Sequence, residues 1–182
     1  MATAADLARG VRVRLDSARR HASEPVPASS LAAFRIAFGL LAVAGALRFL
    51  AKGWVGRLYL EPEHHLTYTG LEWAEPLPGV LAYAHVALLA ALGLAIAIGY
   101  RHRIAAALYA VAFTYAELIE ATLYLNHYWF ISLVAVLLVF LPANRRWSVD
   151  ARAGRVRSPG WVPRGAIWIV RAQLGVVYVF AQ

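Results

Sequence analysis

Five apolar segments, each about as long as a membrane-crossing helix, occupy most of this chain. A helix needs roughly 20 consecutive apolar residues to cross a bilayer. The segments lie at about 31–51, 79–100, 104–123, 125–141 and 165–182. Hydrophobic residues make up 61% of the 182 positions, and a soluble fold of this size could not bury so many apolar side chains. We therefore predict an all-α fold, a polytopic transmembrane bundle of about five helical spans.

Basic residues are distributed unevenly among the segments that flank these spans. Five arginines lie in the polar lead-in, residues 1–28, and eight lie in the connections after the second and fourth spans. The connection after the first span holds two basic residues, and the turn after the third holds none. Because cytoplasmic loops carry an excess of Lys and Arg, the pattern predicts a cytoplasmic N-terminus. The Ala- and Arg-rich composition indicates a bacterial protein, so we expect residues 29–182 to lie in the bacterial plasma membrane.

Composition and missing motifs exclude several classes of protein. The net charge of +8 does not indicate a nucleic-acid partner, because the basic residues lie between apolar segments rather than on a soluble face. The chain has no Cys, which excludes zinc fingers and thiol catalysis. The run from Glu61 to His65 contains carboxylates and imidazoles, but consecutive residues rarely converge on one ion and no HExxH spacing occurs. We therefore expect no metal, and no phosphate-loop or nucleophile-elbow motif occurs.

Charged side chains inside the spans are costly, about 2.5–3.5 kcal/mol at the centre on insertion scales, and therefore indicate function. We expect Arg35 and Arg48, near the two ends of the first span, to snorkel to the interfaces. Glu117 and Glu120 are three residues apart in the third span and would share one helix face. Arg171, in the fifth span, could pair with either glutamate. Two interpretations stay open, an ion pair that packs helices together and a polar pocket within the bundle.

Asn126, His127 and Tyr128 open the fourth span at its non-cytoplasmic end, close to Glu120. A histidine there can exchange protons near neutral pH, and an asparagine offers a donor and acceptors. The same residues could instead anchor the helix at the interface. The long first connection, rich in aromatic residues and prolines, could be a lid over a site or an interfacial loop. The residues that we predict to form the polar pocket are Glu117, Glu120, His65 and Tyr68.

The predicted pocket is of a kind that suits an apolar ligand. Its polar groups are dispersed within the membrane, which fits a quinone or a lipid-like molecule better than a soluble nucleotide. His85, in the second span, is expected to be a satisfied polar residue between helices.

Three stretches of the sequence form a recognisable set. The first is Tyr124-Leu-Asn-His-Tyr-Trp, followed after an apolar span by Leu141-Pro-Ala-Asn-Arg-Arg-Trp-Ser-Val-Asp150. The others are the connection over 59–78 and the stretch over 171–181, Arg-Ala-Gln-Leu-Gly-Val-Val-Tyr-Val-Phe-Ala. Together they resemble the vitamin K-dependent gamma-carboxylase family, whose bacterial relatives share a membrane region called the HTTM domain. The resemblance covers about 29–182.

The resemblance implies the chemistry of that family. There, a lysine base deprotonates vitamin K hydroquinone, and reaction with oxygen gives a strong base that removes a gamma proton from a peptide glutamate. Carbon dioxide then adds, the vitamin is left as an epoxide, and a dry pocket protects the base from water. Asn126 and His127 would bind or polarise the quinone oxygens and are the candidate catalytic residues. The implied cofactor-binding residues are Asn126, His127, Tyr128, Arg171 and Tyr178, and the implied partners are membrane lipid and a glutamate-containing peptide.

The sequence departs from the family at its C-terminal end. The family's catalytic lysine follows the stretch that corresponds to Tyr178–Ala181, so its position would fall a few residues beyond Gln182. The family's large soluble C-terminal part is also missing. We therefore expect the membrane half of a carboxylase-like protein, catalytically incomplete as it stands. The alternative is a non-catalytic membrane module that binds a quinone or lipid, or assists the maturation of an exported peptide. The short length and the lack of inverted repeats disfavour a transporter.

Overall fold

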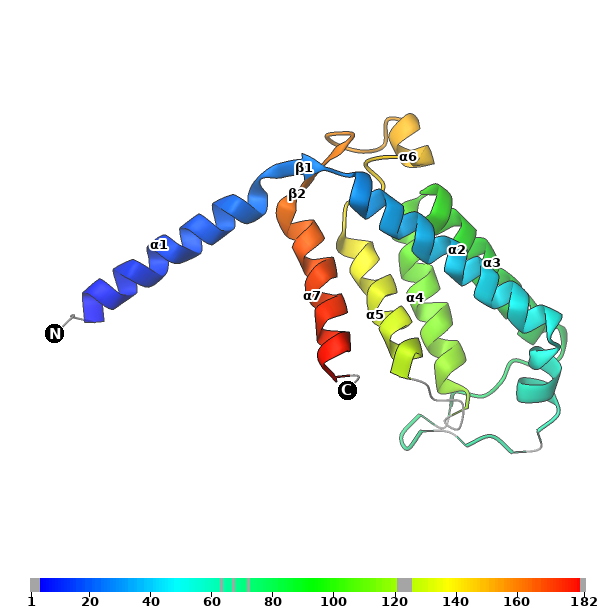
Figure 1. Ribbon diagram of the computed structural model, residues 1–182. Helices are drawn as coiled ribbons and strands as arrows, with labels where there is room; N and C mark the ends of the chain where they lie inside the picture. The colour runs from blue at the N-terminus through cyan, green and yellow to red at the C-terminus, as the bar shows by residue number, and fades with distance from the viewer. Residues whose placement is uncertain (1–3, 63, 67, 72, 121–125, 181–182) are drawn as a thin grey trace.

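The computed structural model describes residues 4–62, 64–66, 68–71, 73–120 and 126–180, and this part of the chain is mostly helical (Figure 1). The long helices are α1 (Ala4–Ser23), α2 (Ser29–Ala51), α3 (Val80–Ile98), α4 (His102–Leu118), α5 (Asn126–Phe140) and α7 (Arg164–Phe180). The short elements are the π-helix η1 (Gly56–Leu60), α6 (Val149–Arg152), β1 (Pro25–Pro27) and β2 (Trp161–Pro163). The predicted helical character is confirmed, and the two three-residue strands are additions to it.

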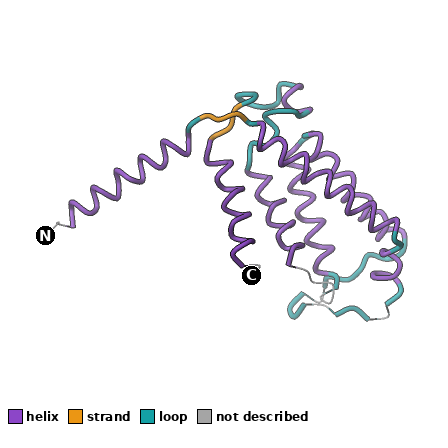
Figure 2. The backbone as a smooth tube through the Cα atoms, in the orientation of Figure 1, coloured by secondary structure: helices purple, strands orange, loops and turns teal. Residues whose placement is uncertain are grey.

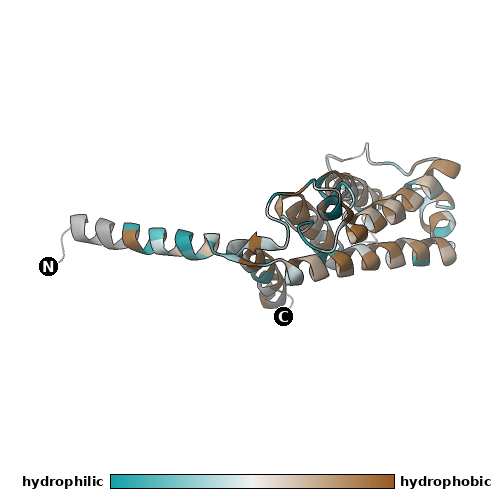
Figure 3. Cartoon of the chain, turned by 90° about the horizontal axis from the view of Figure 1, so that it is seen from above, coloured by the Kyte–Doolittle hydropathy of each residue, from teal (hydrophilic) through white to brown (hydrophobic). Residues whose placement is uncertain are grey.

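Among the described residues, two helices are long and apolar enough to cross a membrane, α2 with 23 residues and α3 with 19. At 1.5 Å per residue they are about 34 and 28 Å long, close to the ~30 Å hydrocarbon core of a bilayer. Only 28% and 39% of their most apolar windows are buried, whereas a core helix of a soluble protein would bury such side chains. In Figure 3 apolar residues cover the bundle helices, and polar residues gather on α1 and the connections. Lipid is therefore the solvent that fits this surface.

The other three predicted spans are shorter as helices. α4 and α7 have 17 residues each and α5 has 15. The third predicted span, 104–123, is displaced, because α4 begins at His102 and ends at Leu118. Glu120 therefore lies beyond the helix, and the expectation that it shares a helix face with Glu117 is wrong. The number of spans and the cytoplasmic position of the N-terminus stay predictions.

Glycines allow the two candidate membrane spans, α2 and α3, to approach closely. α2 and α3 lie side by side, followed by α4 and α5, with α7 at the edge of the bundle (Figures 1 and 2). A Cβ on Gly39 of α2 would lie 2.5 Å from the backbone N of Ala97 and 2.6 Å from the carbonyl O of Gly93 on α3. Small residues at such helix contacts are typical of membrane bundles.

The bundle has two distinct ends. At one end β1 and β2 pair antiparallel, with Val26 opposite Val162, close to α6; we call it the strand end. The connection over 52–79 lies at the opposite end, the loop end. The tryptophans near the loop end are Trp54, Trp73 and Trp129, and those near the strand end are Trp147, Trp161 and Trp168. These six are all the tryptophans of the chain, and because tryptophan is enriched at membrane–water interfaces, their distribution is typical of a bundle whose two ends lie at the two interfaces.

Candidate functional site

The loop end brings together polar residues from the first connection and from the end of α4. His65 lies in the connection, and its Nδ1 is 3.1 Å from Oε2 of Glu120. Both side chains are largely buried, 14% and 11% exposed. The hydroxyl of Tyr59 in η1 donates to the carbonyl O of Ala116 at 3.4 Å. The connection therefore folds back onto the end of α4.

The hydroxyl groups of a threonine and a serine form a short chain of hydrogen bonds that ends at Glu117. Thr114 Oγ1 on α4 donates to Ser132 Oγ on α5 at 3.1 Å, and Ser132 Oγ donates to Glu117 Oε2 at 2.8 Å. Glu117 Oε1 is buried and accepts no hydrogen bond from any residue that the structure describes. A carboxylate oxygen without a donor in an apolar setting is costly. This oxygen is therefore a place where the hydroxyl group of a ligand could donate.

Aromatic rings pack against one another on the neighbouring turns of α4 and on α5. Phe113 stacks on Tyr109 of the same helix, with ring centroids 5.5 Å apart, and meets Tyr128 of α5 edge-on at 6.1 Å. Tyr59, in η1 outside the helical spans, is close enough to be influenced by Glu117. Burial, followed by the nearby Tyr128 and Glu117, raises the pKa of Tyr59 to about 12. The loop end thus combines an apolar wall with few polar groups.

Arg171 does not join this cluster. α7 packs against α1, α2 and β2 at the edge of the bundle, and the Arg171 side chain is exposed. Glu120 pairs with His65 and Glu117 with Ser132, and none of the ion pairs between described residues includes Arg171. The predicted pairing of Arg171 with Glu117 or Glu120 is therefore wrong, because α7 carries the arginine away from α4.

Three predicted site residues have side chains that lie outside the described part of the structure, namely Asn126, His127 and Tyr178. The backbone places Asn126 and His127 in the first turn of α5, at the loop end, and Tyr178 near the end of α7. Tyr128 and Tyr68 are half-buried, the former on α5 and the latter in the first connection. The ligand-binding roles of these five residues stay predictions.

His85 lies between helices as the sequence predicted, whereas the snorkelling of Arg48 to an interface stays a prediction. His85 is satisfied between helices, since its Nε2 lies 3.0 Å from the carbonyl O of Ala112 on α4. The exposed Arg48 lies over the ring of Trp54 at the loop end, 5.2 Å from its centroid. Among the described residues, no three His, Asp or Glu side chains form a group that could hold a metal ion.

The strand end contains an arginine, Arg35, whose burial the sequence did not predict. Arg35 of α2 is 0% exposed, whereas we expected it to snorkel to the interface. Its Nη1 donates to the carbonyls of Ala143 (3.1 Å) and Arg146 (3.4 Å), and its Nη2 to those of Ala97 (3.1 Å) and Trp147 (2.7 Å). The expectation is wrong because these carbonyls, at a helix end and in a loop, replace water around the guanidinium.

Asp150, the last residue of the Trp-Ser-Val-Asp motif, completes the strand-end cluster. Its carboxylate is 4% exposed and accepts from the backbone N–H groups of Arg101 and His102, both at 3.0 Å. The side chains of Asn144 and Arg155 also donate to it. Burial alone would raise the pKa of Asp150, but these hydrogen bonds outweigh burial and lower the pKa below its ordinary value of 3.8. The motif thus ties the turn between α3 and α4 to the segment after α5.

Comparison with known proteins identifies one family. A family model described as the HTTM domain matches residues 23–182, whereas no solved structure matches the chain. The matched region includes both ends of the bundle and the three stretches on which the sequence resemblance rests. The resemblance to the HTTM domain is therefore confirmed.

Proposed function

We propose, from the premise that this chain belongs to the HTTM domain family, that the loop end of its bundle binds a lipid-soluble quinol. The observation that carries the proposal is the buried Glu117 Oε1, which lacks a donor among the described residues. A quinol carries two hydroxyl groups on an apolar ring, and one of them could donate to this oxygen. Hydrogen bonds that involve a charged group contribute about 1.5–3 kcal/mol.

The surroundings of Glu117 also fit the apolar part of such a ligand. Small-molecule sites are mostly apolar, with a few polar groups that fix orientation. Phe113 and Tyr128 would supply the aromatic wall, and the pair of His65 and Glu120 lies at the same end of the bundle. Asn126 and His127, in the first turn of α5, start from that end as well.

The family resemblance supports carboxylation as the reaction that the quinol serves. A bound quinol would supply the reducing equivalents with which oxygen is activated. Glu117 would hold its hydroxyl group, Ser132 would orient Glu117, and the pair of His65 and Glu120 could pass a proton between imidazole and carboxylate. A glutamate-containing peptide is the proposed substrate, and the bacterial plasma membrane is the proposed location, with the strand end and the N-terminus inside.

Titration of the protein in nanodiscs with vitamin K hydroquinone tests the binding step, with quenching of intrinsic fluorescence as the readout. We expect Glu117→Gln to weaken binding about tenfold, because the amide replaces a charged acceptor. The matched control is Glu75→Gln, which changes an exposed glutamate of the first connection and should leave the affinity unchanged.

Two results would contradict the proposal. Equal affinity in Glu117→Gln and in the unaltered protein would remove Glu117 from the site, and a chain that binds no quinol would leave a module that assists peptide maturation. Incorporation of carbon dioxide into a glutamate peptide and formation of the epoxide are followed in the same samples. Because the position of the family's lysine would fall beyond Gln182, the reaction is also assayed in a chain extended past that residue. Binding without either product in the extended chain would favour the non-catalytic module over the carboxylase.

A further inference from the structure

Helix α1 projects away from the bundle and is attached to it through its C-terminal end (Figures 1 and 3). Ala22 lies against Gly165 at the start of α7, where a Cβ on the glycine would be 3.3 Å from the Ala22 Cβ. Arg164 Nη2 lies 2.8 Å from Glu24 Oε2, just beyond α1. The root of α1 is therefore fixed at the strand end, and the rest of the helix extends beyond the bundle.

The described part of α1 is amphipathic. Leu15, Ala18 and Ala22 are spaced by three and four residues and share one helix face. Arg12 and Arg19 border this apolar stripe at 100° per residue. Leu15 is 52% exposed, so the bundle does not cover it. Apolar stripes bordered by arginines are typical of helices that lie in a membrane interface.

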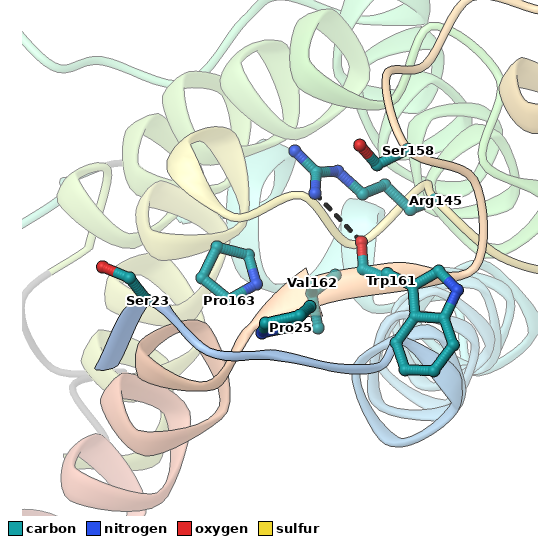
Figure 4. A pocket seen from close by; sticks show the side chains of 7 residues that line it. All are labelled: Ser23, Pro25, Arg145, Ser158, Trp161, Val162 and Pro163. Carbon is teal, nitrogen blue, oxygen red and sulfur yellow. Dashed lines mark hydrogen bonds between the residues drawn. The ribbon is translucent and has the colours of Figure 1, made fainter. Parts of the chain in front are cut away.

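The root of α1 lies where the interface is expected. Trp161 and Trp168 flank it and are 51% and 40% exposed, as is typical of tryptophans at headgroup level. A surface pocket of about 470 Å³ lies beside the root (Figure 4). Its lining residues are Ser23, Pro25, Arg145, Ser158, Trp161, Val162 and Pro163. Arg145, whose Nη1 donates to the carbonyl O of Trp161 at 2.9 Å, adds a positive charge to this surface.

We propose that α1 lies on the bilayer surface at the strand end and binds the headgroups of anionic lipids, with its apolar stripe dipping into the acyl region. Charge complementarity selects this partner, because α1 carries five arginines and only two aspartates and basic helices are drawn to anionic leaflets. The occupant of the apolar stripe is the same bilayer that surrounds the bundle. This inference does not depend on the quinol proposal.

Single-cysteine labelling of the whole chain tests the inference, and it is clean because the chain has no native Cys. Leu15→Cys and Ser17→Cys receive an environment-sensitive fluorophore, and the protein is reconstituted at one chain per nanodisc with lipids that carry a quencher in the acyl region. Position 17 is the matched control, since it is exposed and lies about 200° around the helix from position 15. In nanodiscs that contain phosphatidylglycerol, the label at position 15 should be quenched several-fold more strongly than the label at position 17.

A second comparison varies the charge of the lipid and the number of arginines in α1. Quenching at position 15 should fall several-fold in pure phosphatidylcholine, and equally when Arg12, Arg14, Arg19 and Arg20 are replaced by Gln. Equal quenching at the two positions, or quenching that ignores lipid charge, would overturn the inference. Quenching at position 15 that appears only with two chains per disc would also overturn it, since a second copy would then cover the stripe.

Discussion

Arg35 at the strand end and Glu117 at the loop end are both charged side chains inside the bundle, yet their surroundings differ. Arg35 donates to four backbone carbonyls, although its Nε has no partner among the described residues, and the nearby Asp150 accepts from four donors. Glu117, by contrast, accepts one hydrogen bond from a described residue, Ser132, and its second oxygen has none.

This difference in hydrogen bonding indicates that the two ends of the bundle have different roles, one in stability and one in ligand binding. Buried polar groups that keep most of their hydrogen bonds rigidify a fold, whereas a buried carboxylate with a single donor is costly. Such costs are expected at functional sites. We therefore interpret the strand end, around Arg35 and Asp150, as the structural anchor of the domain and the loop end, around Glu117, as its ligand site.

Removal of the buried arginine should have the largest effect on stability. Arg35→Leu leaves four carbonyls without their donor and removes one of the positive charges near Asp150, so we expect a loss of about 3–5 kcal/mol in the free energy of unfolding. Unfolding by a denaturing detergent, followed by circular dichroism, measures this loss. Arg48→Leu, at the exposed end of the same helix, should cost no more than about 1 kcal/mol, the value of a surface cation–π contact.

Replacement of Glu117 by leucine is the corresponding change at the loop end, and it tests whether the two ends differ in role. Glu117→Leu replaces a partly satisfied carboxylate with an apolar side chain, so its unfolding free energy should be unchanged or higher, by about 0–2 kcal/mol. Quinol binding should be lost in the same variant. A destabilisation by Glu117→Leu as large as that by Arg35→Leu would show that both ends are structural.

Two glycines with the same backbone conformation give a smaller, matched pair. Gly99 at the strand end has φ +67°, and Gly53 at the loop end has φ +65°. A Cβ on Gly99 would clash with the Ser148 Cβ and lie 2.6 Å from Arg35 Nη1, whereas a Cβ on Gly53 would meet nothing within 4 Å. Gly53→Ala should cost about 1–2 kcal/mol from the left-handed backbone alone. Gly99→Ala adds about 1–3 kcal/mol of overpacking, and thermal unfolding of both variants compares them.

Acid should loosen the strand end by the smallest amount. Because the pKa of Asp150 is lower in the folded protein than its ordinary 3.8, its contribution to stability is present above that value and is lost as pH falls through the folded pKa. Amide protection factors at Arg101 and His102, whose N–H groups donate to Asp150, should therefore fall below about pH 4. Asp150→Asn should remove this pH dependence, and a profile that persists in the variant would assign it to another group.

The sequence predicted much of the helical architecture but misplaced several charged side chains. Hydropathy located the apolar helices, since segment length and composition are local properties. Helix ends were less predictable, and α4 ends at Leu118 rather than continuing through Glu120. His65 and Glu120 were assigned to one pocket, and the structure brings them within 3.1 Å. The Arg171 pairing failed because hydropathy does not reveal which helices are neighbours.

The Trp-Ser-Val-Asp motif shows a second limit of sequence reasoning. It identified the family, but its physical role became visible only when Asp150 was seen to accept the N–H groups of Arg101 and His102. The carbonyl O of Gly99 accepts from the Asp150 N–H at 3.0 Å. A glycine at this position is the local sign in the sequence that the backbone near Asp150 comes close to the end of α3.

By itself the sequence determined that this chain belongs in lipid, that it forms apolar helices, and that its family is that of the HTTM domain. Each of these properties depends on composition, segment length or motif order. Only the tertiary structure decided which charge is buried among many hydrogen-bond partners and which has a single one. The acceptors of Arg35 include Ala97 and Trp147, 62 and 112 residues away along the chain. An arginine that snorkels and one that binds such distant carbonyls look the same in sequence, because burial depends on what the other helices bring beside it.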